Sequence, residues 1–247
     1  LSEVTNVKNL TIQADTNLNV AQATNTLNVS GNFTLAVGGT FTHANGKVVF
    51  NGTTNQTISG AITFYDLEVN NTGAGTAVSL ANNTTITNAL TITAGKLDAG
   101  QALSHTASSV SITGTLFLNT STLAVSGNLT VNAGGILDLT SNGASAIDLD
   151  VNGNITVNGT LDWSNSGVGI SVAGDWTVTG TVNSTNSTST VTFDGAVVQT
   201  VSVTGSAGGD FINIVLNQGA GGQVQLNSAT VVVKGNITLN TGLLAKT

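Results

Sequence analysis

The chain has 247 residues with no Cys, Met or Pro, only 7% charged residues, and a formal net charge of −7 from five basic and twelve acidic side chains. This acidity excludes an extended nucleic-acid-binding surface, and the lack of Cys excludes disulfides and thiolate metal sites. No stretch of the sequence is apolar for long enough to span a membrane as a helix.

The composition also favours strands over helices. Thr, Val, Asn and the 30 Gly residues are poor helix formers, whereas the best helix formers do not dominate the chain. The first residue is Leu rather than Met, so we expect a mature exported protein from which a secretory leader has been removed.

A seven-residue motif recurs along the chain: apolar, variable, Gly, Asn or Asp, apolar, Thr, apolar. Its copies span residues 29–35, 125–131, 151–157, 172–178 and 233–239. The glycines of the three central copies, Gly127, Gly153 and Gly174, follow one another at intervals that match one coil of a solenoid. In such a coil three short strands are joined by turns.

A larger internal duplication overlies the motif. Phe50 and Gln56 recur as Phe193 and Gln199, with the same spacing between the two members of each pair. The expected organisation is a single solenoid domain over residues 1–247, in which related units at 29–100 and 172–247 flank simpler coils at 101–171.

Apolar and polar residues alternate between the turn signals, as in the run from Leu90 to Thr93, which is typical of half-buried strands. Hairpin sandwiches share this alternation, but they have no reason to repeat one motif along the chain. Stacked coils place like residues in ladders, where charges repel one another and Thr, Asn and Val are tolerated. We therefore predict an all-β, right-handed parallel β-helix of about eleven coils with uncapped ends.

The predicted core consists of the apolar members of the repeated motif and the two duplicated phenylalanines. These residues are Val29, Phe33, Leu35, Phe50, Val125, Leu129, Val131, Val151, Ile155, Val157, Val172, Trp176, Val178, Phe193, Val233, Ile237 and Leu239.

The run from Val49 to Gly60, followed by residues 64–71, resembles a repeat of large secreted surface proteins of bacteria and archaea. Those proteins are similar to filamentous-haemagglutinin-type adhesins. The resemblance covers about 50 residues in two copies, of which the second ends in the degenerate segment 211–217. It implies an extracellular β-solenoid with a structural or adhesive role.

The sequence predicts no catalytic, cofactor-binding or metal site. Asp148 and Asp150 form the densest acidic pair and would share one face of a strand, but the more economical interpretation is a solvated strand end. His43 and His105 are interpreted as turn or surface histidines. No strict Thr-x-Thr unit recurs once per coil, which argues against an ice-binding face.

Fifteen Asn-x-Ser/Thr sequons suggest N-glycosylation of an exported protein, although the Gly-Asn-x-Thr motif itself generates several of them. The best candidates are the sequons in turn-like sequence, at Asn51, Asn70, Asn82, Asn183 and Asn186.

The two ends of the chain look like sister coils without a polar cap. Uncapped coils of this kind expose unpaired backbone groups, so a head-to-tail contact between copies is expected. Residues 1–6 could instead be donated to a neighbour as an added strand. The predicted interface comprises Val7, Asn9, Leu10, Thr11 and Ile12 at one end and Val233, Asn236, Ile237, Thr238 and Leu239 at the other.

The function expected from the sequence is that of a secreted, non-enzymatic structural subunit that polymerises end to end into an extracellular filament or surface layer. Its partner would be a second copy of itself, with surface glycans as a further possible ligand. One alternative is a cell-surface adhesin segment that binds glycans or surfaces. A second alternative is a polysaccharide-active β-helix enzyme.

Overall fold

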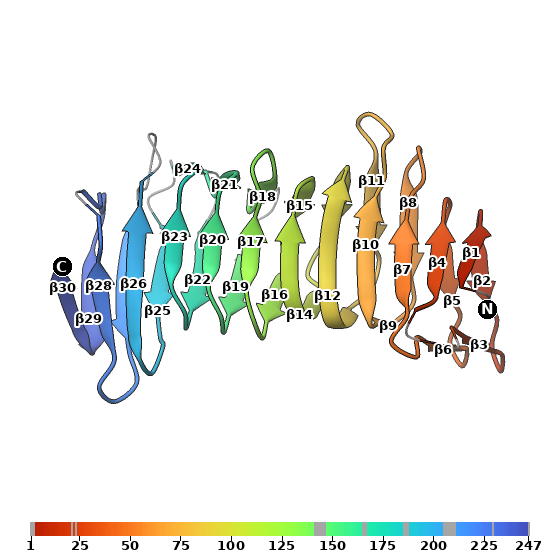
Figure 1. The fold of residues 1–247 in the computed structure, drawn as a ribbon, viewed down its shortest axis with the longest axis horizontal. Helices are drawn as coiled ribbons and strands as arrows, with labels where there is room; N and C mark the ends of the chain where they lie inside the picture. Colours follow the sequence, from red (N-terminus) through yellow and green to blue (C-terminus); the bar gives the residue numbers. More distant parts are fainter. Residues whose placement is uncertain are drawn as a thin grey trace.

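The computed structural model describes residues 3–20, 22, 24–140, 147–164, 167–184, 188–204, 211–228 and 230–246. Its strands stack in parallel as a β-solenoid of about 11 turns, which confirms the predicted fold class. The two termini lie at opposite ends of an elongated rod (Figure 1). None of the described elements is an apolar helix of membrane-spanning length.

The strands build three faces, which successive segments of the chain occupy in a fixed order. The first face holds β1 (Val4–Val7), β4 (Thr26–Val29), β7 (Lys47–Phe50), β10 (Asp66–Asn70), β17 (Leu129–Val131), β20 (Ile155–Val157), β23 (Trp176–Val178), β26 (Val198–Val203), β28 (Gln223–Leu226) and β30 (Leu243–Lys246). In Figure 1 this face is the row of arrows that point the same way along the whole rod.

The second and third faces complete each coil. The second face holds β2 (Leu10–Ile12), β5 (Phe33–Leu35), β8 (Gln56–Ser59), β11 (Ala77–Leu80), β13 (Lys96–Asp98), β15 (Thr115–Phe117), β18 (Ile136–Asp138), β21 (Thr160–Asp162) and β24 (Thr181–Asn183). The third face holds β9 (Ile62–Phe64), β16 (Thr122–Val125), β19 (Ile147–Val151), β22 (Val168–Val172), β25 (Thr190–Phe193), β27 (Asn213–Asn217) and β29 (Ile237–Thr241).

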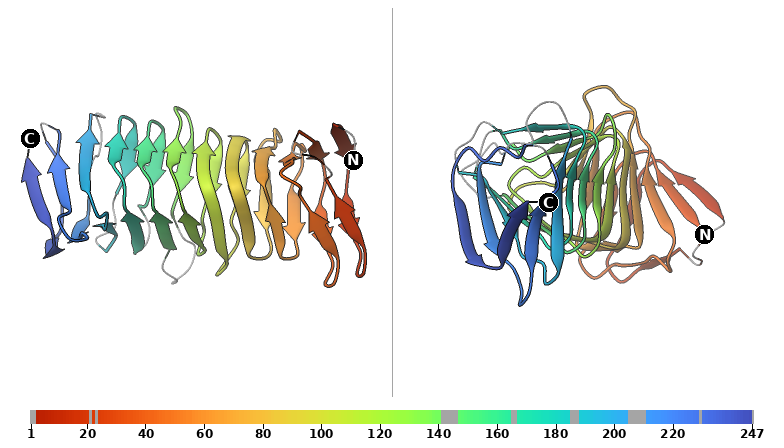
Figure 2. Two further views of the ribbon diagram at one scale, coloured as in Figure 1. Left: turned by 60° about the horizontal axis from the view of Figure 1, so that its bottom comes forward. Right: turned by 60° about the vertical axis from the view of Figure 1, so that its left-hand side comes forward.

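Four further strands do not belong to a single face. β12 (Thr84–Ala94) and β14 (Ser104–Ile112) each run around the corner from the third face to the first, and their mutual register shifts at that corner. β3 (Asn17–Asn19) and β6 (Thr40–Thr42) pair with each other beside the first coils. Figure 2 shows the coils following one another along the rod from two further directions.

Strand register is kept although the coils differ in length. Lys47 pairs with Asp66 and Leu129 pairs with Ile155, so the second of these coils is the longer one. All the pairings between described strands are parallel. Insertions are therefore absorbed by the turns, while strand residues continue the ladder of backbone hydrogen bonds.

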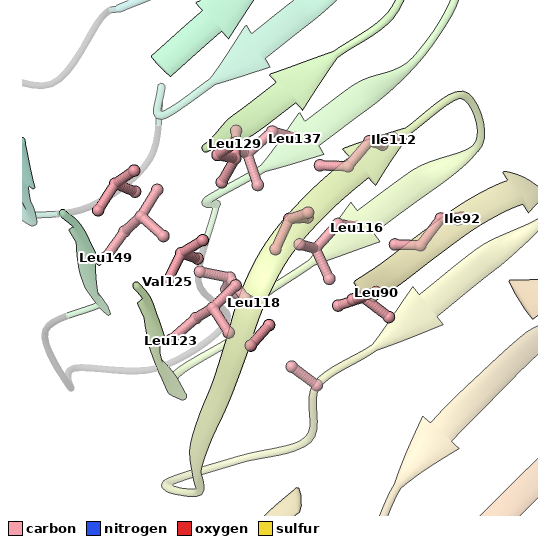
Figure 3. Packing of buried hydrophobic residues seen from close by; sticks show 14 of the residues in the cluster. Leu90, Ile92, Ile112, Leu116, Leu118, Leu123, Val125, Leu129, Leu137 and Leu149 are labelled. Atoms are coloured by element: carbon pink, nitrogen blue, oxygen red, sulfur yellow. The ribbon is translucent and has the colours of Figure 1, made fainter. Parts of the chain in front are cut away.

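The core is a continuous apolar column along the axis of the rod. Strands of all three faces direct alternate residues inward, such as Ile112, Leu116 and Leu123 in Figure 3. Thirteen of the predicted core residues are buried: Val29, Phe33, Phe50, Val125, Leu129, Val131, Val151, Ile155, Val157, Val172, Trp176, Val178 and Phe193. Leu35 and Val233 are partly buried against this core.

The prediction is wrong for Ile237 and Leu239, which are 48% and 58% exposed. Both residues lie on β29, in the last of the described coils. Among the described strands, β29 pairs with β27 alone, so no further described coil covers its apolar side chains. The same alternation that buries residues in an inner coil thus leaves them open at the end of the stack.

Each copy of the seven-residue motif forms a corner between two faces, but not always the same corner. Residues 29–35 lead from the first face to the second, whereas the three central copies lead from the third face to the first. The copy at 233–239 leads into the third face. The motif is therefore a corner unit, which forms a corner wherever it occurs and does not determine which two faces of the rod that corner joins.

The glycine of the motif is required because neighbouring coils approach closely at the corner. A Cβ atom at Gly153 would lie 2.5 Å from the carbonyl oxygen of Gly127, and one at Gly174 would lie 2.5 Å from that of Gly153. Neither distance leaves room for a side chain, since the obstructing atoms are backbone.

Each of the two duplicated units contains a buried aromatic cluster. Phe33 packs edge-on against Phe64 with 6.0 Å between ring centroids, and Trp176 packs against Phe211 at 5.4 Å. Phe50 and Phe193 occupy equivalent positions but lie on the first and third faces, respectively. The second unit follows the first after six coils and two faces, so it is rotated about the rod axis.

Candidate functional site

A ladder of Asn and Asp side chains ties the corners of successive coils together. The side-chain oxygen of Asn128 accepts the N–H of Asn154 at 2.8 Å, and that of Asn154 accepts the N–H of Asp175 at 2.8 Å. Asp175 in turn accepts the N–H of Thr200 at 2.7 Å. Sequons that coincide with the corner motif therefore supply structural hydrogen bonds between coils.

The candidate glycosylation residues differ in their surroundings. Asn51, Asn82 and Asn183 are exposed, and Asn70 is half-buried at the end of β10. The side-chain oxygen of Asn82 accepts the N–H of Gly60 at 2.7 Å, and Asn183 donates to Asp162 at 3.3 Å. Asn186 lies outside the described residues. Asn51, which is exposed at a strand end, has the least constrained side chain of the set.

The acidic pair Asp148 and Asp150 lies on the outer surface of the third face. Both residues alternate along β19 with buried apolar residues, and Asp148 is exposed while Asp150 is half-buried. Burial raises the pKa of the half-buried Asp194 carboxyl, and the charge of Asp150 raises it further. Within the described ranges, no three His, Asp or Glu side chains gather as a metal-binding group.

A shallow groove of about 300 Å³ lies where β12, β14 and β16 pass from the third face toward the first. Most of the lining surface itself is apolar, but six of the nine lining residues carry a hydroxyl or amide group: Thr85, Thr87, Thr106, Ser108, Ser126 and Asn152. Asp150 lies beside it, since it pairs with the groove residue Ala124. The groove presents neutral hydrogen-bonding groups, with a carboxylate at its border.

His105 is not a surface residue, which corrects the sequence interpretation. Its side chain is 3% exposed and lies inside the coil, where Nε2 is 2.8 Å from the carbonyl oxygen of Ala99. Nδ1 accepts the N–H of Thr84 at 3.2 Å, so Nε2 carries the proton in the neutral ring. Burial lowers the pKa of His105. Both ring nitrogens are thus used by the backbone of the solenoid.

His43 lies in a turn, as the sequence predicts. Its Nδ1 accepts the N–H of Asn45 at 3.2 Å, and Asn45 has a positive φ of 62°. The imidazole also stacks on Tyr65 with 5.8 Å between ring centroids. The two histidines therefore belong to separate local structures rather than to a shared site.

Two buried glutamines, Gln56 and Gln199, have a structural role that was not inferred from the sequence. Gln56 accepts the N–H of Gly52 at 3.0 Å and donates to the carbonyl oxygens of Val29 and Gly31 at 2.9 and 2.7 Å. Gln199 makes the equivalent contacts with Gly195, Val172 and Gly174. The recurrence of Gln at the same position of both duplicated units was the available signal.

The predicted interface residues lie at the two ends of the rod. At one end Ile12 is buried, Val7 and Leu10 are half-buried, and Asn9 and Thr11 are exposed. At the other end Val233 is half-buried, and Asn236, Ile237, Thr238 and Leu239 are exposed. The structure does not bring the two sets together, since one lies in the first coil and the other in the last.

The C-terminal end is hollow as well as apolar. A recess of about 260 Å³ is lined there by Leu226, Ser228, Thr230, Val231 and Lys246. Leu243, on the same strand β30 as Lys246, is 58% exposed. At the opposite end Val4 on β1 is 56% exposed. Both terminal coils thus present apolar side chains at the ends of the strand ladders.

Comparison with known proteins finds no matching family model, no matching curated protein and no matching solved structure. The assignment of the chain therefore rests on its own geometry, which is that of a parallel β-solenoid built from repeated corner units.

Proposed function

We propose that the chain is a secreted structural subunit that assembles end to end, through its terminal coils, into an extracellular filament or surface layer. The observation that carries this proposal is the set of exposed apolar residues Ile237, Leu239 and Leu243, on strands that each pair with one described neighbour. A coil from a second copy would cover these side chains as an inner coil does. The sequence resemblance to secreted surface repeats supports the same role.

Backbone geometry indicates how the ends would meet. Ile214 donates its N–H to the carbonyl oxygen of Asn236 at 2.9 Å, and in a parallel ladder alternate residues bond to the same neighbour. The N–H of Ile237 therefore faces away from β27, toward an incoming strand. At the corner, Asn236 donates to Asn213 at 3.0 Å, which leaves its own side chain at the end of the ladder.

The faces constrain the pairing between copies. β2 belongs to the second face and β29 to the third, so the predicted pairing of these two segments needs a rotation about the rod axis. Stacking that continues every face would instead join β30 to β1 of the next copy, since both belong to the first face. Either arrangement buries apolar side chains and satisfies backbone groups, so the contact should resist salt.

The test introduces a charge at the open end. Leu239→Glu should keep the protein monomeric in sedimentation velocity and electron microscopy, because stacking would bury an unpaired carboxylate. The matched control is Val37→Glu, which changes a fully solvated apolar residue that is 98% exposed and should leave filaments intact. Wild-type protein that stays monomeric at high concentration would overturn the proposal.

The groove beside Asp150 favours a second candidate function, that of an adhesin segment that binds neutral glycans. Its hydroxyl and amide groups can contact the hydroxyls of a sugar without requiring charge, and its apolar surface can contact the faces of the sugar ring. Titration calorimetry with soluble oligosaccharides would test it, with Thr106→Tyr as a variant that fills the groove. Binding that the variant abolishes would support an adhesive role, and no detectable binding would remove it.

A further inference from the structure

Six consecutive coils display two columns of small hydroxyl and amide side chains on the outer surface of the first face. The central column is Thr91, Ser111, Thr130, Thr156, Thr177 and Ser202, which are successive register partners. The second column, two residues further along each strand, is Thr93, Thr113, Asn132, Asn158, Thr179 and Thr204. We call these twelve side chains the hydroxyl net.

The register of the second column follows from backbone hydrogen bonds. Asn132 donates its N–H to the carbonyl oxygen of Ile112 at 2.7 Å, and Asn158 donates to Val131 at 2.7 Å. Thr204 continues the series with Val178 at 2.9 Å. The ladder thus extends one residue beyond each strand and holds the second column in line.

The net has a regular spacing along the rod. Coils repeat at about 4.8 Å, so each column of six side chains is about 24 Å long. Except for Thr93, the second column lies one residue beyond the strand ends and runs beside the central column. All the strands of the first face that carry the net run in the same direction, as Figure 1 shows. The side chains therefore form two parallel columns with a regular repeat rather than a random polar surface.

The net is held rigid from both sides. Its inner neighbours, such as Ile92 and Val157, are buried, and the β-branched Thr side chains have restricted χ1 angles. Asn132 donates to the hydroxyls of Ser111 and Thr113 at 3.0 and 3.2 Å. A hydroxyl lattice with so little rotamer freedom loses little entropy when it orders a layer of water.

No member of the net is charged. The nearest carboxylate in the adjoining column is Asp175, whose side chain is bonded to the N–H of Thr200. Glu68 precedes the central column by one coil, and it pairs with Lys47 at 3.0 Å and accepts the hydroxyl of Thr93 at 3.0 Å. An uncharged, regular surface favours an uncharged, regular ligand.

We infer that the hydroxyl net is an ice-binding surface. An ice face is a periodic lattice of oxygen atoms that donate and accept hydrogen bonds, and the net presents donors and acceptors at the regular repeat of the coils. Threonine supplies a hydroxyl that joins such a lattice and a methyl group that excludes disordered water. The two tryptophans, whose rings could stack on a sugar, are both buried in the core instead (Trp163 and Trp176).

The sequence alone argued against this function, because the tripeptides do not repeat strictly. Ser replaces Thr in two coils and Asn replaces it in two others, and the coils that carry the net differ in length. Only strand register shows that the twelve positions align. This proposal uses the side of the rod, so it is independent of end-to-end assembly.

The test measures thermal hysteresis and incorporation of labelled protein into a growing ice hemisphere. Wild-type protein should enter the ice, and the double variant Thr130→Tyr/Thr156→Tyr should lose at least ten-fold in hysteresis, because bulky rings interrupt the lattice. Thr130 and Thr156 are half-buried but point outward from their strands, where Tyr is well tolerated, and circular dichroism would verify the fold. Thr192→Tyr, on the outer surface of the third face, is the matched control and should retain full activity.

Three results would overturn the inference. The first is a folded wild-type protein that is excluded from ice, and the second is a double variant that retains wild-type hysteresis. The third is adsorption to microcrystalline cellulose or chitin by a protein that ice excludes, which would assign the net to a neutral polysaccharide. Each measurement would be repeated with Leu239→Glu, so that a failure of filament assembly is distinguished from a failure of ice binding.

Discussion

Two polar side chains buried inside the solenoid have hydrogen-bond partners, as the surrounding backbone groups do. Gln56 and Gln199 are each almost fully buried, yet each makes three hydrogen bonds to backbone groups in two coils. A buried amide with all these partners stabilises one register of stacking over others, because a slipped coil would leave the same groups unpaired. The two glutamines thus fix the corners of the two duplicated units.

Replacing Gln199 with Leu should lower the free energy of unfolding by about 3 kcal/mol, because buried backbone donors and acceptors would lose their partner. The measurement is urea denaturation followed by circular dichroism. Gln225→Leu is the control, since Gln225 is half-buried on the outer side of β28 and should change stability little. Equal effects of the two substitutions would contradict the role assigned to Gln199.

His105 predicts a pH dependence of stability. Its pKa is lowered in the folded protein, so between the folded and unfolded pKa values the unfolded chain binds more protons. Stability should therefore be fully present above the unfolded pKa of about 6.5 and should decrease as the pH falls below it. Thermal unfolding between pH 7.5 and 5 would measure the slope.

His105→Gln should flatten that slope, whereas His43→Gln should leave it unchanged, because His43 lies in a turn outside the core. The absolute stability of His105→Gln is not the readout, since the substitution also alters two hydrogen bonds. A slope that persists in His105→Gln would show that another group controls the acid sensitivity.

At the scale of elements, the corner unit explains both the success and the limits of the sequence analysis. The recurrence of Gly153 and Gly174 at coil spacing predicted a parallel solenoid, because only stacked coils require such contacts. The face on which each strand lies could not be predicted, since it depends on the cumulative length of variable turns. For the same reason the sequence pattern indicated a turn or surface histidine at His105 and did not reveal the hydroxyl net.

Gly153→Ala should destabilise the protein by about 2 kcal/mol, because the added methyl group would press on the backbone of the preceding coil. Gly169→Ala is a matched control on β22, where a Cβ would meet its nearest neighbour at an ordinary 3.6 Å. Chemical denaturation of the two variants provides the comparison. If Gly153→Ala left the free energy of unfolding unchanged, the corners of neighbouring coils could separate without loss of packing.

At the scale of the whole molecule, stability accumulates between neighbouring coils rather than around a central point. Inner strands such as β20 have a paired strand on each side, whereas β29 and β30 each pair with one strand of the described chain. The rod should therefore be most stable in the middle and should open from its ends.

Hydrogen exchange should show this gradient directly. Amides of β17, β20 and β23 should exchange slowest, and those of β29 and β30 fastest, in monomeric protein. Assembly into filaments should slow exchange in β29 and β30 and leave the inner strands unchanged. Uniform protection along the monomer would indicate a single cooperative unit and would contradict the neighbour-by-neighbour description.

The rotation between the two duplicated units has a geometric consequence for growth of the rod. Because one unit follows the other after six coils and two faces, repeating that step would carry any surface pattern around the axis, and three steps would return it to its original side. A chain lengthened in this way would wind its features in a screw, so a contact made by one unit would recur in three directions. Such a rod could be engaged from every side by partners that each recognise a single unit.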